Sequence, residues 1–169
     1  MPTRKTRAGT TNELTGLVNV DVSAVGTMLQ ESLVELTDLH LRGKQAHWNL
    51  AGPTFKPLHE QLDEVVDGVR SAADTVAERA VAIGYAVDGR PDTVAKSTPL
   101  HQFPAGQITV HECVELMTMA LEETCNHIRE RINLLDELDP VSQDTLIGVL
   151  ANLEKYHWMF AVQRVGADA

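Results

Sequence analysis

The sequence has no run of uncharged apolar residues approaching the roughly 20 that a helix needs to cross a bilayer. Its first residues lack the apolar stretch of a secretory signal. Cysteine is scarce. The two present, Cys113 and Cys125, would lie roughly 18 Å apart on one helix, which is too far for a disulfide. We therefore expect a cytoplasmic protein with free thiols and no membrane partner.

Basic residues are also few. The 169 residues include 14 Lys and Arg against 24 Asp and Glu, which gives a formal net charge of −10. This balance argues against a protein whose body binds nucleic acid, and it favours cations as ligands or substrates. The hydrophobic fraction of 43% suits one compact domain with a substantial core.

The first residues differ from the rest of the chain in charge. Residues 1–15 are predicted to form a flexible basic tail, and residues 1–12 within it carry Arg4, Lys5 and Arg7 but no acid. Two interpretations remain open: a solvated terminus, or a basic arm that contacts DNA phosphates. Residues 16–169 are assigned to a single helical domain.

Four long segments have the apolar periodicity of amphipathic helices, and none has the alternation of a strand. The third starts at a Thr109–Glu112 capping box, and the fourth starts at Asp139, followed by proline at the first helical position. We therefore predict an all-α four-helix bundle. The expected helices cover residues 21–48, 55–83, 109–135 and 139–166.

The connections differ in length, and this difference indicates the topology. Residues 49–53 and 138–139 are short, so the first two helices and the last two should form antiparallel hairpins. Residues 84–108 form a long connection in which residues 93–97 are a candidate short helix. A long second connection is typical of ferritin-like bundles and not of the simple up-and-down arrangement.

Histidines and carboxylates on the first two helices form the most specific pattern. His59 and Asp63 are four residues apart on the second helix, and so are Asp74 and Glu78, which places all four in one broad sector of its surface. The tight loop after the first helix should bring His47 back toward the start of the second. These five residues are candidate metal ligands.

One chain cannot close a single site with all five. Asp63 and Asp74 are eleven residues apart, roughly 16 Å along a helix, whereas metal–oxygen bonds are about 2 Å long. Two antiparallel copies of the second helix would place Asp74 and Glu78 of one chain opposite His47, His59 and Asp63 of the other. Such an isologous contact creates two identical sites, so the chemistry requires a homo-oligomer.

The donor set suits ferrous iron, zinc or manganese, and the absence of cysteine nearby disfavours structural zinc and iron–sulfur clusters. Any one of these side chains alone would be read as solvated or hydrogen-bonded. A rival site inside the bundle would use Glu154, His157, His127 and Glu130, but it contains only one Glu-x-x-His motif and is incomplete. The remaining histidines are expected to be surface or hydrogen-bonded residues: His40, His101, His111 and His127.

The segment HWNLAGP at residues 47–53, with LHEQLD at residues 58–63, resembles the first signature of the Dps family, the DNA-binding proteins from starved cells. The segment DTVAERA at residues 74–80 resembles the second. The resemblance extends over nearly the whole chain. It implies a ferritin-like bundle with a short helix in the long connection, assembled into a hollow dodecamer.

The resemblance also implies a function. A dinuclear iron site would be shared by His47, His59 and Asp63 of one subunit and Asp74 and Glu78 of its two-fold mate. Fe(II) would be oxidised there, preferably by hydrogen peroxide and more slowly by oxygen, and stored as ferric mineral. Trp48 would lie beside the site, either quenching oxidising equivalents or only packing at the interface.

Two further roles follow from the resemblance. Asp144, and more weakly Asp139, would line acidic pores for iron. Their simpler interpretations are an N-cap for Asp139 and a first-turn acid for Asp144. Arg4, Lys5 and Arg7 would contact DNA. The competing functions are a nucleoid-compacting protein with a secondary iron role, and a structural or heme-binding cage.

Overall fold

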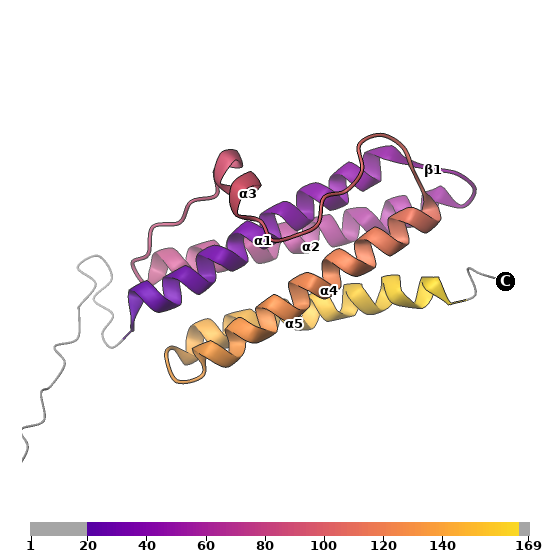
Figure 1. The fold of residues 1–169 in the computed structure, drawn as a ribbon. Helices are drawn as coiled ribbons and strands as arrows, with labels where there is room; N and C mark the ends of the chain where they lie inside the picture. The colour runs from indigo at the N-terminus through magenta and orange to yellow at the C-terminus, as the bar shows by residue number, and fades with distance from the viewer. Residues whose placement is uncertain (1–19, 166–169) are drawn as a thin grey trace, which may run out of the picture.

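A computed structural model describes residues 20–165. Its helices run in the order that the sequence predicts, including the short one in the long connection (Figure 1). The all-α, ferritin-like bundle is therefore confirmed. The elements are α1 (Val22–Asn49), β1 (Leu50–Ala51), α2 (Phe55–Ala82), α3 (Pro91–Ser97), β2 (Ile108–Thr109), α4 (Val110–Leu135), α5 (Pro140–Ala161) and a 3-10 turn, η1 (Val162–Arg164).

The helix starts are fixed by local hydrogen bonds. Asp21 accepts from the Ala24 N–H at 3.1 Å ahead of α1, and Thr109 and Glu112 form the predicted capping box ahead of α4. The start of α2 is different, because Thr54 adopts a left-handed conformation with φ 62° and its side chain makes no cap bond. Gly52, at φ 121°, supplies the preceding turn that returns the chain from α1.

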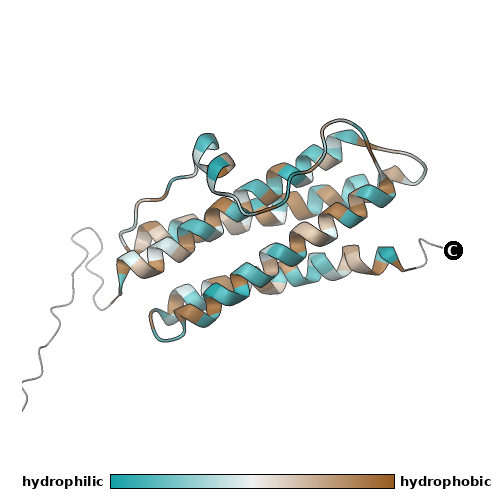
Figure 2. Ribbon diagram, viewed as in Figure 1, coloured by the Kyte–Doolittle hydropathy of each residue, from teal (hydrophilic) through white to brown (hydrophobic). Residues whose placement is uncertain are grey.

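The bundle consists of two antiparallel hairpins, α1 with α2 and α4 with α5, which pack against each other along their lengths (Figure 1). Hydrophobic residues alternate with hydrophilic ones around every long helix, so each buries one stripe (Figure 2). All four long helices contribute to the largest fully buried side chains, and Ile83, just after α2, joins them: Leu29, Leu36, Leu39, Leu62, Ile83, Met117, Leu121, Ile128, Leu135, Leu146, Leu153 and Phe160.

The long connection after α2 crosses the bundle and is tied to α1. Gln30 both donates to the Asp88 carbonyl at 2.8 Å and accepts from the Asp88 N–H at 2.7 Å. Farther along, Arg42 donates to the Leu100 carbonyl at 3.0 Å. These bonds anchor the crossover over the α1 surface, so α4 begins at the end of the bundle where α1 finishes.

Close packing surrounds Gly26 and both cysteines. The Tyr85 ring lies so close to Gly26 that a Cβ there would be 2.0 Å from it. Cys113 and Cys125 are buried free thiols, as predicted, and burial raises the pKa of each to about 12. Within residues 20–165, no helix combines the length and apolar character needed to cross a membrane.

Candidate metal centre

Three of the five predicted ligands come together at one end of the α1–α2 hairpin. His47 stands at the end of α1, and His59 and Asp63 stand one turn apart near the start of α2. One potential ligand atom from each lies within 4.8 Å of the others. Within the described part of the chain, no other set of three or more such side chains meets this condition.

The two imidazoles are held in place by reciprocal contacts with the backbone. His47 Nδ1 is 3.0 Å from the His59 carbonyl, and His59 Nδ1 is 3.1 Å from the His47 carbonyl. A carbonyl only accepts, so each Nδ1 carries the proton and donates, which leaves Nε2 of both rings free to bind a metal. The two rings stack with centroids 3.6 Å apart and an interplanar angle of 21°, so the imidazoles lie side by side.

A lysine that the sequence analysis did not single out completes this half of the site. The Lys44 ammonium donates to Asp63 Oδ1 and holds the pKa of that carboxyl below its ordinary value. Asp63 Oδ1 also lies 3.3 Å from His47 Nδ1. The carboxylate is therefore ionised and already holds a cation. The sequence did contain a signal for Lys44. It precedes His47 by three residues on α1, and this spacing places both side chains on one face of the helix.

Asp74 and Glu78 do not join the group. Both are exposed on α2, farther along the helix, and Asp74 lines an open groove of about 640 Å³ between α1, α2 and the crossover. The structure therefore brings three predicted ligands together within one chain and leaves two displaced along the helix. Helix geometry requires this separation of any single copy.

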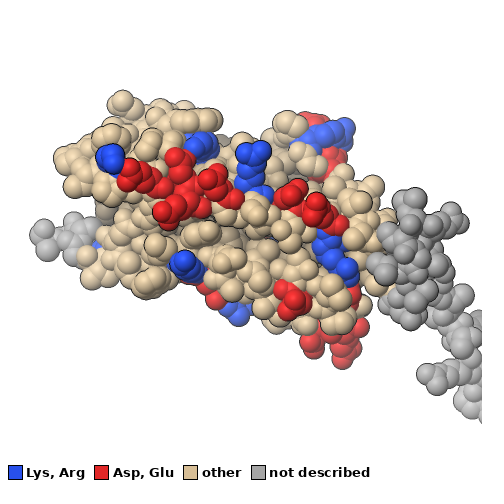
Figure 3. Space-filling view, turned by 180° about the vertical axis from the view of Figure 1, so that it is seen from behind, with Lys and Arg blue, Asp and Glu red and all other residues tan. Residues whose placement is uncertain are grey.

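Acidic side chains are concentrated on the outward side of α2. Figure 3, which views the molecule from behind Figure 1, shows Asp and Glu gathered in a band with few basic side chains between them. The exposed acids of α2 are Glu60, Glu64, Asp67, Asp74 and Glu78. Such a surface attracts cations.

The other residues near the site have less direct positions. Trp48 is 70% exposed and lines a shallow pocket with Leu41 and Phe103, toward the crossover. Its predicted role beside the centre stays a prediction. Phe55 makes an edge contact with the His59 ring at a centroid distance of 6.1 Å, which supports that imidazole from the first turn of α2.

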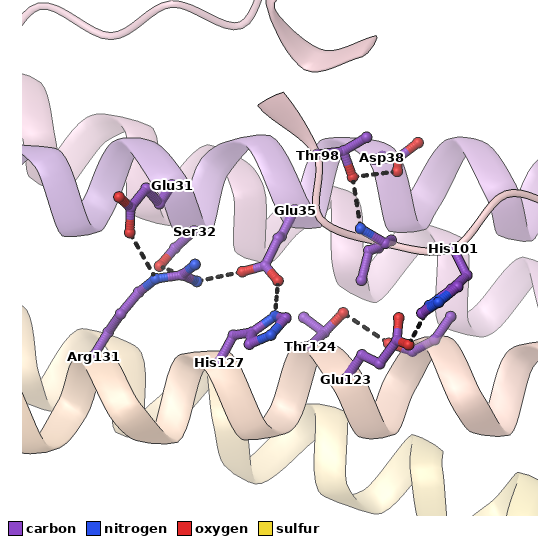
Figure 4. A network of polar contacts seen from close by, with 12 residues as sticks. Glu31, Ser32, Glu35, Asp38, Thr98, His101, Glu123, Thr124, His127 and Arg131 are labelled. Carbon is purple, nitrogen blue, oxygen red and sulfur yellow. Dashed lines mark hydrogen bonds and ion pairs between the residues drawn. The ribbon is translucent and has the colours of Figure 1, made fainter. Parts of the chain in front are cut away.

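The rival site inside the bundle does not form among the described residues. His127 Nδ1 lies 2.5 Å from Oε1 of Glu35, a fully buried residue whose other carboxylate oxygen accepts from Arg131 (Figure 4). Glu154 is exposed and pairs with Arg129. Two members of that rival set, His127 and Glu154, are thus engaged in ion pairs between helices, and His127 is hydrogen-bonded as predicted.

The other histidines mostly match their predicted roles. His101 is hydrogen-bonded to Glu123 at 2.5 Å, and His111 is exposed. His40 differs, because its Nδ1 is buried without a hydrogen-bond partner among residues 20–165. Burial lowers the pKa of His40.

The two candidate pore residues have different surroundings. Asp139 is 5% exposed and caps α5, accepting from Ser142 and from Arg79 at 2.6 Å, which confirms its N-cap interpretation. Burial would raise the pKa of Asp139, but the Ser142 hydrogen bonds and the Arg79 guanidinium outweigh it and leave the pKa below its usual value. Asp144 is exposed, and its first-turn interpretation is wrong because the first turn of α5 contains no acid.

Residues 27–165 match the family model of the ferritin-like domain, which defines the class of protein. The DNA protection during starvation protein of Mycolicibacterium smegmatis is 36% identical over 143 residues, covering 85% of this chain and 78% of the relative. The protein of that name from Agrobacterium fabrum is 35% identical over 159 residues, covering 94% of each. The chain belongs to the Dps family.

Solved structures agree with this assignment. Dps from Microbacterium arborescens, in a high-iron form, superposes with a TM-score of 0.81 at 32% identity, covering 84% of this chain and 93% of that one. The predicted family is therefore confirmed by sequence and by fold. The DNA-contacting candidates Arg4, Lys5 and Arg7 lie outside the described residues.

Proposed function

We propose that this protein is a cytoplasmic ferroxidase and iron-storage protein whose dinuclear sites are shared between two-fold-related subunits of a hollow dodecamer. The observation that carries the proposal is the convergence of His47, His59 and Asp63. Asp74 and Glu78 are exposed farther along α2, the helix that carries His59 and Asp63. The relatives' name and the high-iron form of one of them support iron as the substrate and DNA protection as the purpose.

The chain's own residues explain how Fe(II) would be bound. Each imidazole offers Nε2, because its Nδ1 proton is donated to a backbone carbonyl. Asp63 offers a hard carboxylate oxygen once Lys44 is displaced, and the partner's Asp74 and the partner's Glu78 supply further oxygens that suit the ferric product. Trp48, exposed and adjacent in sequence to His47, is proposed to take up stray oxidising equivalents.

Hydrogen peroxide is the proposed oxidant, on the strength of the resemblance to the Dps family. Two Fe(II) ions each give up one electron, the O–O bond breaks, and both oxygens are reduced to the level of water, with ferric oxyhydroxide and protons as products. Paired delivery avoids the one-electron step that releases hydroxyl radical. Oxygen would serve more slowly. The product would accumulate on acidic walls inside the assembly, reached through pores that include Asp144.

Complementation between subunits tests the shared site. The variants His47→Ala/His59→Ala and Asp74→Ala/Glu78→Ala should each assemble but lose rapid oxidation after anaerobic Fe(II) loading and peroxide addition. Co-expressed, they should recover about a quarter of the wild-type rate, because half of random dimers are mixed and each mixed dimer holds one intact site.

A matched control uses Glu60→Ala/Glu64→Ala, which removes two exposed acids at the same spacing on the same helix and should leave the rate unchanged. Undiminished oxidation by the Asp74→Ala/Glu78→Ala variant would refute the site. Loss of oxidation in both separate variants without recovery in the mixture would place each site within one chain.

A second proposed role, nucleoid DNA compaction through the tail, rests on the relatives' name and on the three basic residues in the tail. A gel shift with and without residues 1–15, at low and physiological salt, measures it. Binding that requires the tail and survives physiological salt would support compaction, and binding lost at physiological salt would count against it.

A further inference from the structure

Between Asp63 and Asp74, the ligand-bearing sector of α2 carries two charged residues that the proposed site does not use. At about 100° per residue, Asp67 and Arg70 fall in the same sector, about 100° wide, as His59, Asp63 and the second ligand pair. Both are exposed, and both line the groove of about 640 Å³ that contains Asp74. No ion pair involves either of them within residues 20–165.

The shared site fixes how two copies of α2 would align. If His59 and Asp63 of one chain face the partner's Glu78 and the partner's Asp74 in antiparallel order, both facing pairs have the same midpoint. That midpoint falls between Gly68 and Val69. The two-fold axis must cross α2 there, because the axis relates every residue to the one equally far on the other side.

The same symmetry places Asp67 directly opposite the partner's Arg70, and Arg70 opposite the partner's Asp67. We propose that these two reciprocal ion pairs beside the axis are the positioning contacts that set the register of the shared iron site, with a second copy of this chain occupying the groove. The inference rests on the proposed function, since the iron site supplies the register.

The local structure supports a close approach at this point. Val69 is fully buried, and Gly68 faces the Tyr156 hydroxyl of α5, so the two midpoint residues point inward. Asp67 and Arg70 are left as the outward positions that flank the axis. Small residues share the groove lining with them, which lets a second helix come near: Ser71, Ala73, Ala77 and Gly89.

The charges also disfavour one of the neighbouring registers. Sliding one helix by about a turn in one direction would place Asp67 opposite the partner's Asp74, a pair of like charges. A slip of that size, about 5.4 Å, would also pull the ligand halves apart by far more than a metal–oxygen bond tolerates. On each α2, the midpoint of His59 and Asp63 is position 61, and the midpoint of Asp74 and Glu78 is position 76. In the proposed register, the two iron centres of a dimer therefore lie about 22 Å apart, which is the helical rise over these fifteen residues.

Opposite-charge mixing tests the contact. Asp67→Arg leaves arginine at both positions 67 and 70 of each chain, and Arg70→Asp leaves aspartate at both positions. Each variant alone confronts like charges across the axis, so we expect its dimer dissociation constant to rise about tenfold or more in sedimentation velocity without iron. The co-expressed pair should recover assembly, Fe(II) oxidation and the 22 Å spacing, because unlike charges then meet between chains.

Recovery of assembly cannot come from an ion pair within one chain, since residues 67 and 70 of each variant carry charges of the same sign as each other. Glu122→Arg and Lys155→Asp, at exposed positions of α4 and α5, make the same charge changes outside the groove and should leave assembly intact. Wild-type assembly of both single variants, or failure of the mixture to recover, overturns the inference. The assembly measurement uses no iron, so its failure is separate from loss of the ferroxidase function.

Discussion

The buried carboxylate of Glu35 gives a stability prediction whose size follows from the structure. Glu35 has no solvent exposure. One carboxylate oxygen lies 2.5 Å from Nδ1 of His127 on α4, and the other accepts a hydrogen bond from the Arg131 guanidinium (Figure 4). Glu35→Leu removes both contacts. Arg131, whose side chain is only 12% exposed, then keeps an ion pair with the half-exposed Glu31 at 3.3 Å.

Removing one partner of a buried ion pair costs about 3–5 kcal/mol of unfolding free energy, because the other charge stays desolvated. For a chain of this length, each kcal/mol lowers the melting temperature by about 2–4 °C, so Glu35→Leu should lower it by about 6–20 °C. Glu31→Gln removes only the exposed partner and should cost less than about 1 kcal/mol. The double variant Glu35→Leu/Arg131→Leu should recover much of the loss.

Differential scanning calorimetry of metal-free protein measures these shifts. Protein concentration must be the same for every variant, because the proposed assembly would make the melting temperature depend on concentration. The reasoning fails if Glu35→Leu melts within a few degrees of Glu31→Gln. It fails equally if the double variant melts well below Glu35→Leu, since the second substitution should relieve a desolvated charge that keeps only the half-exposed Glu31 as its partner.

Three further predictions concern single positions. Lys44→Met should tighten anaerobic Fe(II) binding about two- to fivefold in calorimetric titration, because it frees a half-exposed carboxylate, and weaker binding would contradict this. Gly26→Ala should destabilise by about 1–3 kcal/mol against Tyr85, whereas Gly148→Ala, whose Cβ meets nothing within 4 Å, should stabilise by about 0.5–1 kcal/mol in urea unfolding. Ionised Asp139 stabilises the fold above about pH 4, and this stabilisation is lost as pH falls through its lowered pKa. Asp139→Asn should therefore make the urea unfolding midpoint fall less steeply as the pH is lowered into this range.

Most of the fold could be predicted because it depends on local periodicity and caps. The expected short helix at 93–97 is α3 (Pro91–Ser97), and the fourth helix, expected to residue 166, ends at Ala161 and continues as a 3-10 turn. The parallel pairing of Leu50 with Ile108 was missed, because two residues are too few to show strand alternation.

The polar contacts between helices could not be predicted from sequence spacing. Glu35 interrupts an apolar stripe of α1, and its partner His127 lies 92 residues away, so its burial becomes intelligible only when α1 and α4 are in contact. Within the site, His47, His59 and Asp63 were predictable because a hairpin and one helical turn bring them together. Asp74 and Glu78 were assigned from their sector of the second helix and from the resemblance to the Dps family, and their proposed partners belong to another chain.

The two buried thiols have a consequence for a protein proposed to bring iron and peroxide together. Peroxide oxidises the thiolate form of cysteine, and burial raises the pKa of both thiols to about 12, so very little of either thiol is ionised at pH 7. Cys113 and Cys125 lie on α4, inside the bundle, where they serve as small apolar side chains. The folded protein therefore contains sulfur that its own oxidant leaves largely unreacted, and loss of that protection by local unfolding of α4 would be recorded as sulfinic or sulfonic acid at these two positions.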